Sequence, residues 1–198
     1  MIKIIGTSHL ISKEEIYRML INENPDIIGI ELCEAREDAI LKEIKSDNNN
    51  KTLLGRITNS IKNKANKEGL DYGSDMKAAL NYSINNNIPR VLVDMPILKI
   101  QELFLKIPIE EQEGFAKELL DFETESLDKD INENEVIEGM KSRYPIAFEF
   151  LINMRNLYIS NQLLITRIKN PGKKIVIILG SSHAVNVKQM IGGIEWTD

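Results

Sequence analysis

The sequence predicts an α/β fold with a mostly parallel central sheet of about four strands, flanked by helices. Four short runs rich in Ile and Val have the length and composition of buried strands, and helical patterns separate them along the chain. Strands that alternate with helices pair in parallel, because each helix carries the chain back to the starting edge of the sheet. The expected strands are residues 2–5, 26–32, 90–94 and 174–179.

Start and stop signals place the helices between these strands. The sequence Ser-Lys-Glu-Glu at residues 12–15 is a capping box, and Pro25 follows, so a helix is expected from this box to about Asn24. A basic amphipathic helix is expected over residues 52–67. The other expected helices are residues 34–44, 75–86 and 144–168.

The longest expected helix, residues 144–168, carries apolar side chains at helical spacing, and these predict its buried face. Arg155 lies beside this face, so its side chain either reaches inward or extends its charge past the apolar residues to solvent. The apolar residues of the expected face are Phe150, Leu151, Met154, Leu157, Tyr158 and Ile165.

The 198 residues fit one domain, residues 1–198, with a sizeable core. Residues 96–143 have a helical but polar pattern and are expected to form a helical insertion or lid. Within them, residues 121–138 hold eight acidic side chains against one lysine, which marks the least core-like stretch of the chain.

Composition limits the class of protein. The net charge of −5 and the pI near 5.3 argue against nucleic acid as a partner, because phosphate backbones bind clustered Lys and Arg. The single cysteine, Cys33, forms no intrachain disulfide, and its place at a strand end indicates packing. The longest uninterrupted apolar run, residues 175–179, is far shorter than the roughly 20 residues that span a bilayer. We therefore expect a soluble, cytoplasmic protein without a membrane span.

Both histidines of the chain follow an apolar run and end a Gly-x-Ser-His tetrapeptide, at residues 6–9 and 180–183. The repetition indicates one site built twice from the same element. Residues just past the ends of parallel strands gather at the edge where open α/β sheets bind ligands. Both glycines are expected to make a sharp turn, since glycine tolerates a positive φ angle.

Two carboxylates occupy matching positions at strand ends: Glu31 in the second expected strand and Asp94 in the third. With His9 and His183 they form a set of two imidazoles and two carboxylates, which suits a divalent transition metal or a general base. Two structural alternatives stay open, a salt bridge from Glu31 to Arg36 and a helix-capping role for Asp94.

Six blocks of the chain carry a resemblance to known proteins: residues 6–9 (Gly-Thr-Ser-His), 24–36, 73–79, 91–94, 154–156 (Met-Arg-Asn) and 179–183 (Leu-Gly-Ser-Ser-His). In this order they resemble the TraB/PrgY family, the pheromone-shutdown proteins. The superfamily also includes the Tiki proteases and erythromycin esterase-like proteins. The resemblance covers nearly the whole chain.

This resemblance implies an α/β core with paired Gly-x-x-His motifs, a glutamate at the active edge and, from the Tiki branch, a metal-dependent peptidase activity. The family usually has an arginine after the strand-ending aspartate, where this chain has Met95. Transferred by position, the resemblance implies three residues for catalysis or metal binding, His9, Glu31 and His183, and three in support, Arg36, Asp94 and Arg155.

The function expected first is a metal-assisted hydrolase that acts on a peptide or a small molecule, as a monomer or a homo-oligomer. Glu31 would bind the ion or activate the attacking water, and Arg36 or Arg155 would stabilise the developing oxyanion. One alternative is a metal-free, esterase-like hydrolase with a histidine and Glu31 as general base. Another is a protein that binds a peptide or small ligand without catalysis. The candidate ligands for Mn, Co or Zn are His9, His183, Glu31 and Asp94.

Overall fold

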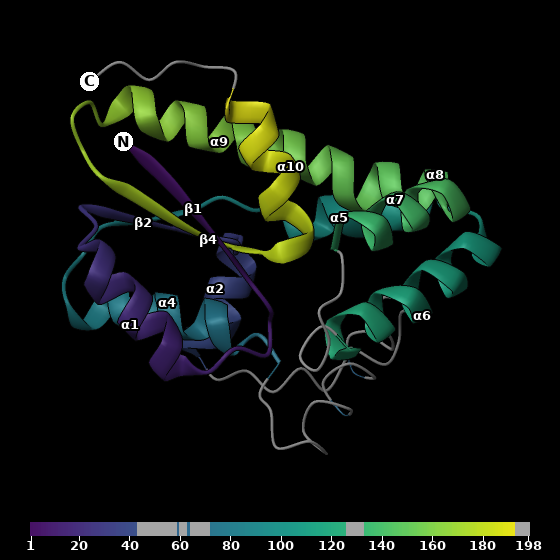
Figure 1. The fold of residues 1–198 in the computed structure, drawn as a ribbon, viewed down its shortest axis with the longest axis horizontal. Coiled ribbons are helices and arrows are strands. Elements are labelled where there is room, and N and C mark those ends of the chain that lie inside the picture. The colour runs from purple at the N-terminus through teal and green to yellow at the C-terminus, as the bar shows by residue number, and fades with distance from the viewer. Residues whose placement is uncertain (43–58, 60–62, 64–71, 126–132, 193–198) are drawn as a thin grey trace.

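The structure is a computed structural model that describes residues 1–42, 59, 63, 72–125 and 133–192 (Figure 1). It confirms the α/β class, because the described part of the chain forms a four-stranded, fully parallel sheet with helices on both faces. The helix expected over residues 52–67 lies outside the described residues, apart from positions 59 and 63. Of the helices that are described, none is long and apolar enough to cross a membrane.

The four expected strands are confirmed, with each end within two residues of its predicted position. They are β1 (Ile2–Thr7), β2 (Ile27–Ile30), β3 (Arg90–Leu92) and β4 (Ile175–Gly180), in the order β1-β4-β2-β3. β4 lies between β1 and β2, and all of its residues are buried. This central position explains why β4 contains the longest apolar run of the sequence.

Alternate residues of β4 face two separate apolar cores. Ile175 and Ile177 pack with α9 (Met154–Lys169) and α10 (Ser181–Gly192) on one face of the sheet. Val176 and Ile178 pack with α1 (Lys13–Glu23) and α4 (Ser74–Asn85) on the other. Figure 1 shows the two pairs of helices on opposite sides of the sheet. Because both faces are covered, the strands are continuous apolar runs with no polar alternation.

Local signals set the ends of the first helices. The Oγ of Ser12 accepts the backbone N–H of Glu15 at 3.2 Å, which confirms Ser12 as the N-cap, and the same Oγ donates to Oε2 of Glu15 at 3.0 Å. Asn24 ends α1 in the left-handed region, with φ at 44°. α2 (Glu34–Leu41) confirms most of the helix expected over residues 34–44, of which the last two are not described.

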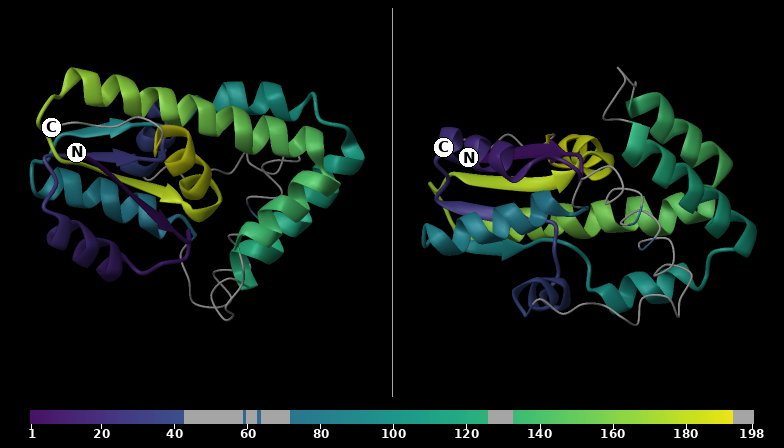
Figure 2. Two further views of the ribbon diagram at one scale, coloured as in Figure 1. Left: turned by 45° about the horizontal axis from the view of Figure 1, so that its top comes forward. Right: turned by 90° about the horizontal axis from the view of Figure 1, so that it is seen from below.

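The helical insertion expected over residues 96–143 is also present. Its described helices are α5 (Ile97–Phe104), α6 (Ile109–Glu125) and α7 (Glu133–Arg143). In both views of Figure 2 these helices lie past the C-terminal ends of the strands.

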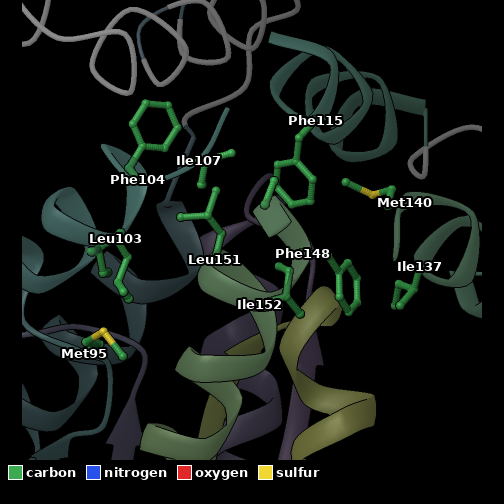
Figure 3. Packing of buried hydrophobic residues seen from close by; sticks show 12 residues of the cluster. Met95, Leu103, Phe104, Ile107, Phe115, Ile137, Met140, Phe148, Leu151 and Ile152 are labelled. Atoms are coloured by element: carbon green, nitrogen blue, oxygen red, sulfur yellow. The ribbon is translucent and has the colours of Figure 1, made fainter. Parts of the chain in front are cut away.

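The helices of this insertion pack with α8 (Pro145–Phe148) and the helical turn that follows, and together they form an apolar core separate from those of the sheet (Figure 3). Phe115 and Met140 are buried in it together with Phe148. Ile137 is buried there too, although it belongs to the stretch predicted to be least core-like. A single apolar face on each helix is enough to build a core, even where acidic side chains cover the rest.

The long helix expected before the last strand is continuous but not uniform. α8 leads into a π-helical turn, η2 (Glu149–Asn153), and then into α9. The predicted buried face was partly wrong, because Leu157 and Ile165 are exposed while Ile159 is fully buried. The true buried face of α9 also carries the polar residue Asn156, so apolar spacing alone selected a neighbouring face.

Candidate functional site

The strand ends bring the candidate residues to one edge of the sheet. His9 follows β1, Glu31 directly follows β2, and Asp94 follows β3. His183 lies in the first turn of α10, which begins where β4 ends. The structure thus places together the four residues that the sequence assigned to this edge, and their contacts show how.

Glu31 lies at the centre of the cluster and is 2% exposed. Its Oε2 accepts the backbone N–H of Gly180 at 2.6 Å, and its Oε1 accepts from Nη2 of Arg155 at 2.7 Å. The Nε2 of His183 lies 3.6 Å from the same Oε1. The salt bridge to Arg36 that the sequence left open is wrong, because that arginine pairs with a different carboxylate.

Asp94 is fully buried and holds two arginines. Its Oδ2 accepts from Nη1 of Arg36 at 2.9 Å and from Nη2 of Arg155 at 3.0 Å, and its Oδ1 accepts from Nε of Arg155 at 3.0 Å. The capping alternative is wrong, since α5 starts after Pro96 without a side-chain cap. Asp94 accepts three hydrogen bonds from guanidinium groups, two on Oδ2 and one on Oδ1, which favours Asp94 as the anchor of the two arginines over the metal-ligand role expected for it.

Arg155 reaches inward, and its side chain is 15% exposed. Of the two orientations that the sequence left open for this side chain, the inward one is therefore correct. Burial lowers the pKa of Arg155, but the charges of Asp94 and Glu31 raise it by more. The guanidinium is thus a fixed positive charge between two buried carboxylates.

His9 is oriented by a buried carboxylate of α4. Its Nδ1 lies 3.1 Å from Oδ2 of Asp75, and Thr7 Oγ1 donates to the same oxygen at 2.7 Å. The ring of Tyr72 stands edge-on to the imidazole, with the ring centroids 5.4 Å apart. Burial raises the pKa of Asp75, but His9 and the hydrogen bonds from His9 and Thr7 lower it by more, so Asp75 is ionised.

His183 is held by Asn156 of α9, whose Oδ1 lies 2.7 Å from the imidazole Nδ1. An amide oxygen accepts, so Nδ1 carries the proton and Nε2 presents a lone pair toward Glu31. Burial and the charge of Arg155 lower the pKa of His183 to about 4, so the ring is neutral at pH 7. The Nδ2 of Asn156 is buried and has no hydrogen-bond partner among the described residues.

Glu31 is ionised at neutral pH. Burial raises its pKa, but the charges of His183, Arg155 and His9 and the N–H of Gly180 outweigh burial and hold the pKa at about 2. Of the two largest lowering charges, that of His183 is lost above about pH 4, whereas that of Arg155 remains at pH 7.

The glycines of the two Gly-x-Ser-His motifs are required for space, and the positive φ angle expected for them is wrong. A Cβ on Gly6 would lie 2.9 Å from the Cβ of Ala184, where β1 meets α10. A Cβ on Gly180 would lie 2.9 Å from Nε2 of His9 and 3.3 Å from Oε2 of Glu31. The two motifs differ in structure, because β1 continues past Gly6 to Thr7, whereas β4 ends at Gly180 and α10 begins at Ser181.

A divalent ion fits part of this donor set. His9 and His183 each have Nδ1 bonded to a side-chain oxygen, as metal-bound histidines usually do. The 3.6 Å between Nε2 of His183 and Oε1 of Glu31 is close to the roughly 3.3 Å between two ligands of a tetrahedral ion. No three His, Cys, Asp or Glu side chains of the described residues already stand in ligand geometry. Small side-chain movements would therefore have to complete the coordination.

No protein-family model matches the chain. Over 217 aligned residues the chain is 24% identical to the uncharacterized protein MJ1365 of Methanocaldococcus jannaschii. The alignment covers 98% of this chain and 54% of that relative, so the chain spans about half the length of the protein it matches. The alignment includes the region of the site, but no activity is assigned to that relative.

Asp75 and Asn156 are site residues that the sequence reasoning did not select. Asp75 lies in the first turn of α4, where acidic residues are common because they interact favourably with the helix dipole. Asn156 lies in the middle of α9, beside Arg155. The signal that would have found both is a polar residue on the buried face of a helix. Such a group is costly unless it has a partner.

Proposed function

We propose that this chain is a metal-assisted hydrolase that acts on peptide bonds, in line with its resemblance to the TraB/PrgY family. His9, His183 and Glu31 would hold Mn, Co or Zn. The observation that carries the proposal is the opposition of Nε2 of His183 and Oε1 of Glu31, 3.6 Å apart and both buried. Arg155 already donates to this Oε1, and a divalent ion bound to both atoms would use the lone pair of Nε2 and a second lone pair of the carboxylate.

The protonation states of these ligands support the proposal. Metal ligands bind in their deprotonated forms. With a pKa of about 2 for Glu31 and about 4 for His183, both are deprotonated at pH 7. A carboxylate with so low a pKa is a poor general base at neutral pH, which favours Glu31 as a ligand over Glu31 as the base.

When bound, the ion supplies polarisation of the substrate carbonyl and an activated water near neutral pH. The chain supplies orientation and charge. Asp75 and Asn156 fix the two imidazoles through Nδ1, so that Nε2 of each is directed into the site. Arg155 is fixed by Glu31 and Asp94, and its positive charge stabilises the negative charge that develops on the carbonyl oxygen.

A second candidate is an esterase-like hydrolase without a metal. It is favoured by Nη2 of Arg155, which already places a positive charge 2.7 Å from Oε1 of Glu31. It is also favoured by the contact of His9 with Asp75, since a buried carboxylate that orients an imidazole is the usual support of a histidine base. In that mechanism His9 would take the proton of the attacking water.

Turnover of a peptide library, by protein purified without a metal-chelating tag, separates the candidates. The proposal expects hydrolysis that is lost in excess EDTA, restored by Mn, Co or Zn, and absent in His9→Ala and Glu31→Gln. Arg18→Gln, on the exposed side of α1, should keep the parental rate and serves as the control. Hydrolysis that persists in excess chelator would instead support the metal-free mechanism. Binding of peptides without any turnover would make the chain a binding protein.

A further inference from the structure

Two arginines from different helices meet on one buried carboxylate at the edge of the site. Arg36 belongs to α2 and Arg155 to α9, and both bond to Oδ2 of Asp94, at 2.9 and 3.0 Å. The side chain of Asp94 is 0% exposed, whereas that of Arg36 is 38% exposed. The carboxylate therefore acts as a buried anchor, and the guanidinium of Arg36 reaches solvent.

The anchoring leaves hydrogen-bond donors unused. Within the part of the chain that the structure describes, Arg36 uses only Nη1, which leaves its Nε and Nη2. Arg155 uses Nε and Nη2, which leaves its Nη1. A guanidinium held in place by one carboxylate and open on its other side is preorganised to bind a second anion, because its planar fork matches two oxygens at once.

The charges of the cluster also leave room for an anion. Glu31 and Asp94 balance Arg36 and Arg155, and Asp75 adds one further negative charge beside His9. Asp75 contacts His9 and Thr7 and not the two arginines, so the free donors of Arg36 and Arg155 favour an anion without any metal, and a bound divalent ion would strengthen that preference. An anionic group on the substrate would then be bound more tightly than a neutral one, especially where water is partly excluded.

We propose that Arg36 and Arg155 form a carboxylate-binding subsite, so that the preferred substrate is a peptide with a free carboxylate close to the bond that is cleaved. This inference rests on the proposed function, because it names the substrate class of the same site. The carboxylate is either the C-terminal group of a short peptide or the side chain of an Asp or Glu residue. Both present two oxygens to the guanidinium fork.

Calorimetric titration of three probes in excess EDTA tests the subsite apart from the metal. The probes are N-acetyl-dialanine, its C-terminal amide, and N-acetyl-alanyl-aspartic acid α-amide, which carries only a side-chain carboxylate. At least one of the two acids should bind about tenfold more tightly than the neutral amide, as expected for a charge-assisted pair. The better of the two acids identifies the source of the carboxylate.

Variants of Arg36 assign the binding to this residue. Arg36→Gln should lower the affinity for the preferred acid about tenfold and leave that for the neutral amide unchanged, and Arg18→Gln should change neither. If Arg36→Gln does not fold, judged by its melting temperature, Arg36→Lys carries the test. It keeps the charge beside Asp94 but loses the fork, so an intermediate affinity is expected.

Three results would overturn the subsite: equal affinity for acids and amide, including no binding of either at millimolar concentration; acid binding that needs added metal; or an acid preference that survives substitution of Arg36. Failure of the proposed function is a separate outcome. An acid preference that depends on Arg36 in EDTA, in a protein that never hydrolyses a peptide, would leave the subsite and remove the hydrolase. Metal-dependent hydrolysis with no acid preference would support the hydrolase and exclude the subsite.

Discussion

His9 and His183 are held by different groups, and the difference affects their chemistry. Asp75, which orients His9, is an ionised carboxylate, whereas Asn156, which orients His183, is a neutral amide. A carboxylate partner makes the imidazole a stronger electron donor to an ion than an amide partner does. We therefore expect His9 to contribute more to metal affinity than His183.

A substitution at Gly180 tests whether the space next to His9 and Glu31 at the end of β4 belongs to the site. In Gly180→Ala the new Cβ would lie 2.9 Å from Nε2 of His9, so the imidazole would have to move. A shift of about 1 Å in a catalytic group costs about 100-fold in rate, and we expect a loss of that order with the fold retained. Gly192→Ala, where the added Cβ has nothing within 4 Å, is the matched control for rate and melting temperature. Full activity in Gly180→Ala would place the reaction elsewhere.

Replacing Glu31 by glutamine should damage both activity and stability, since its carboxylate bonds to Arg155 as well as facing His183. Glutamine can still accept hydrogen bonds, and Asp94 still pairs with Arg155, so we expect a loss of about 1–3 kcal/mol in the free energy of unfolding. Adding Arg155→Met should cost less stability in the Glu31→Gln background than in the parent, because one of its two carboxylate partners is already lost, and should restore no activity. Denaturant unfolding of the single and double variants measures the coupling. Additive losses would contradict the buried ion pair.

Acid should destabilise the metal-free protein through His183. Its pKa is about 4 in the fold and about 6.5 when unfolded, so the unfolded state binds more protons between these values. This contribution is therefore complete above pH 6.5 and is lost as the pH falls toward 4. Glu31, with a pKa lowered from 4.5 to about 2, adds a further loss only below pH 4.5.

The measurement is unfolding in EDTA at pH 7 and at pH 4.5, for the parent and for His183→Gln. The parent should lose on the order of 2 kcal/mol more than the variant over this interval. Equal losses in both proteins would mean that burial does not hold His183 neutral.

At the level of the elements, the strands and their ends were predictable because a fully buried parallel strand needs an unbroken apolar run. The position of His9, Glu31, Asp94 and His183 at one edge followed from those ends. The pairing of the charged groups was not predictable. Arg155 reaches Glu31 from a helix 124 positions later in the chain, and no local pattern reports which arginine a carboxylate will meet.

The helices of the insertion, α5 to α7, have a core separate from the two cores of the sheet, which predicts that they open separately. Phe115→Ala removes a buried ring from that core and should destabilise it by about 3 kcal/mol or more. Hydrogen exchange should then become faster in α5 to α7, while β1 and β4 stay protected. Equal acceleration in the strands would show that insertion and sheet unfold as one unit.

For the molecule as a whole, the parallel sheet is the element that brings the site residues together. Its four parallel strands bring residues from both ends and the middle of the chain to one edge, and helices on opposite faces add Asp75 and Asn156. The same arrangement places the insertion past this edge, on the side where a substrate would approach (Figure 2). The central claim is that this edge binds one ion between His9, His183 and Glu31.

Isothermal titration of Mn, Co and Zn into the parent, His9→Ala, His183→Ala and the double variant tests that claim most directly. If both imidazoles bind one ion, each single variant should lose at least about tenfold in affinity. The metal affinity of the double variant should then be only slightly lower than that of the single variant that binds more weakly, because residues that act as a unit are strongly non-additive. No binding to the parent, or an affinity unchanged in the double variant, would contradict the metal site.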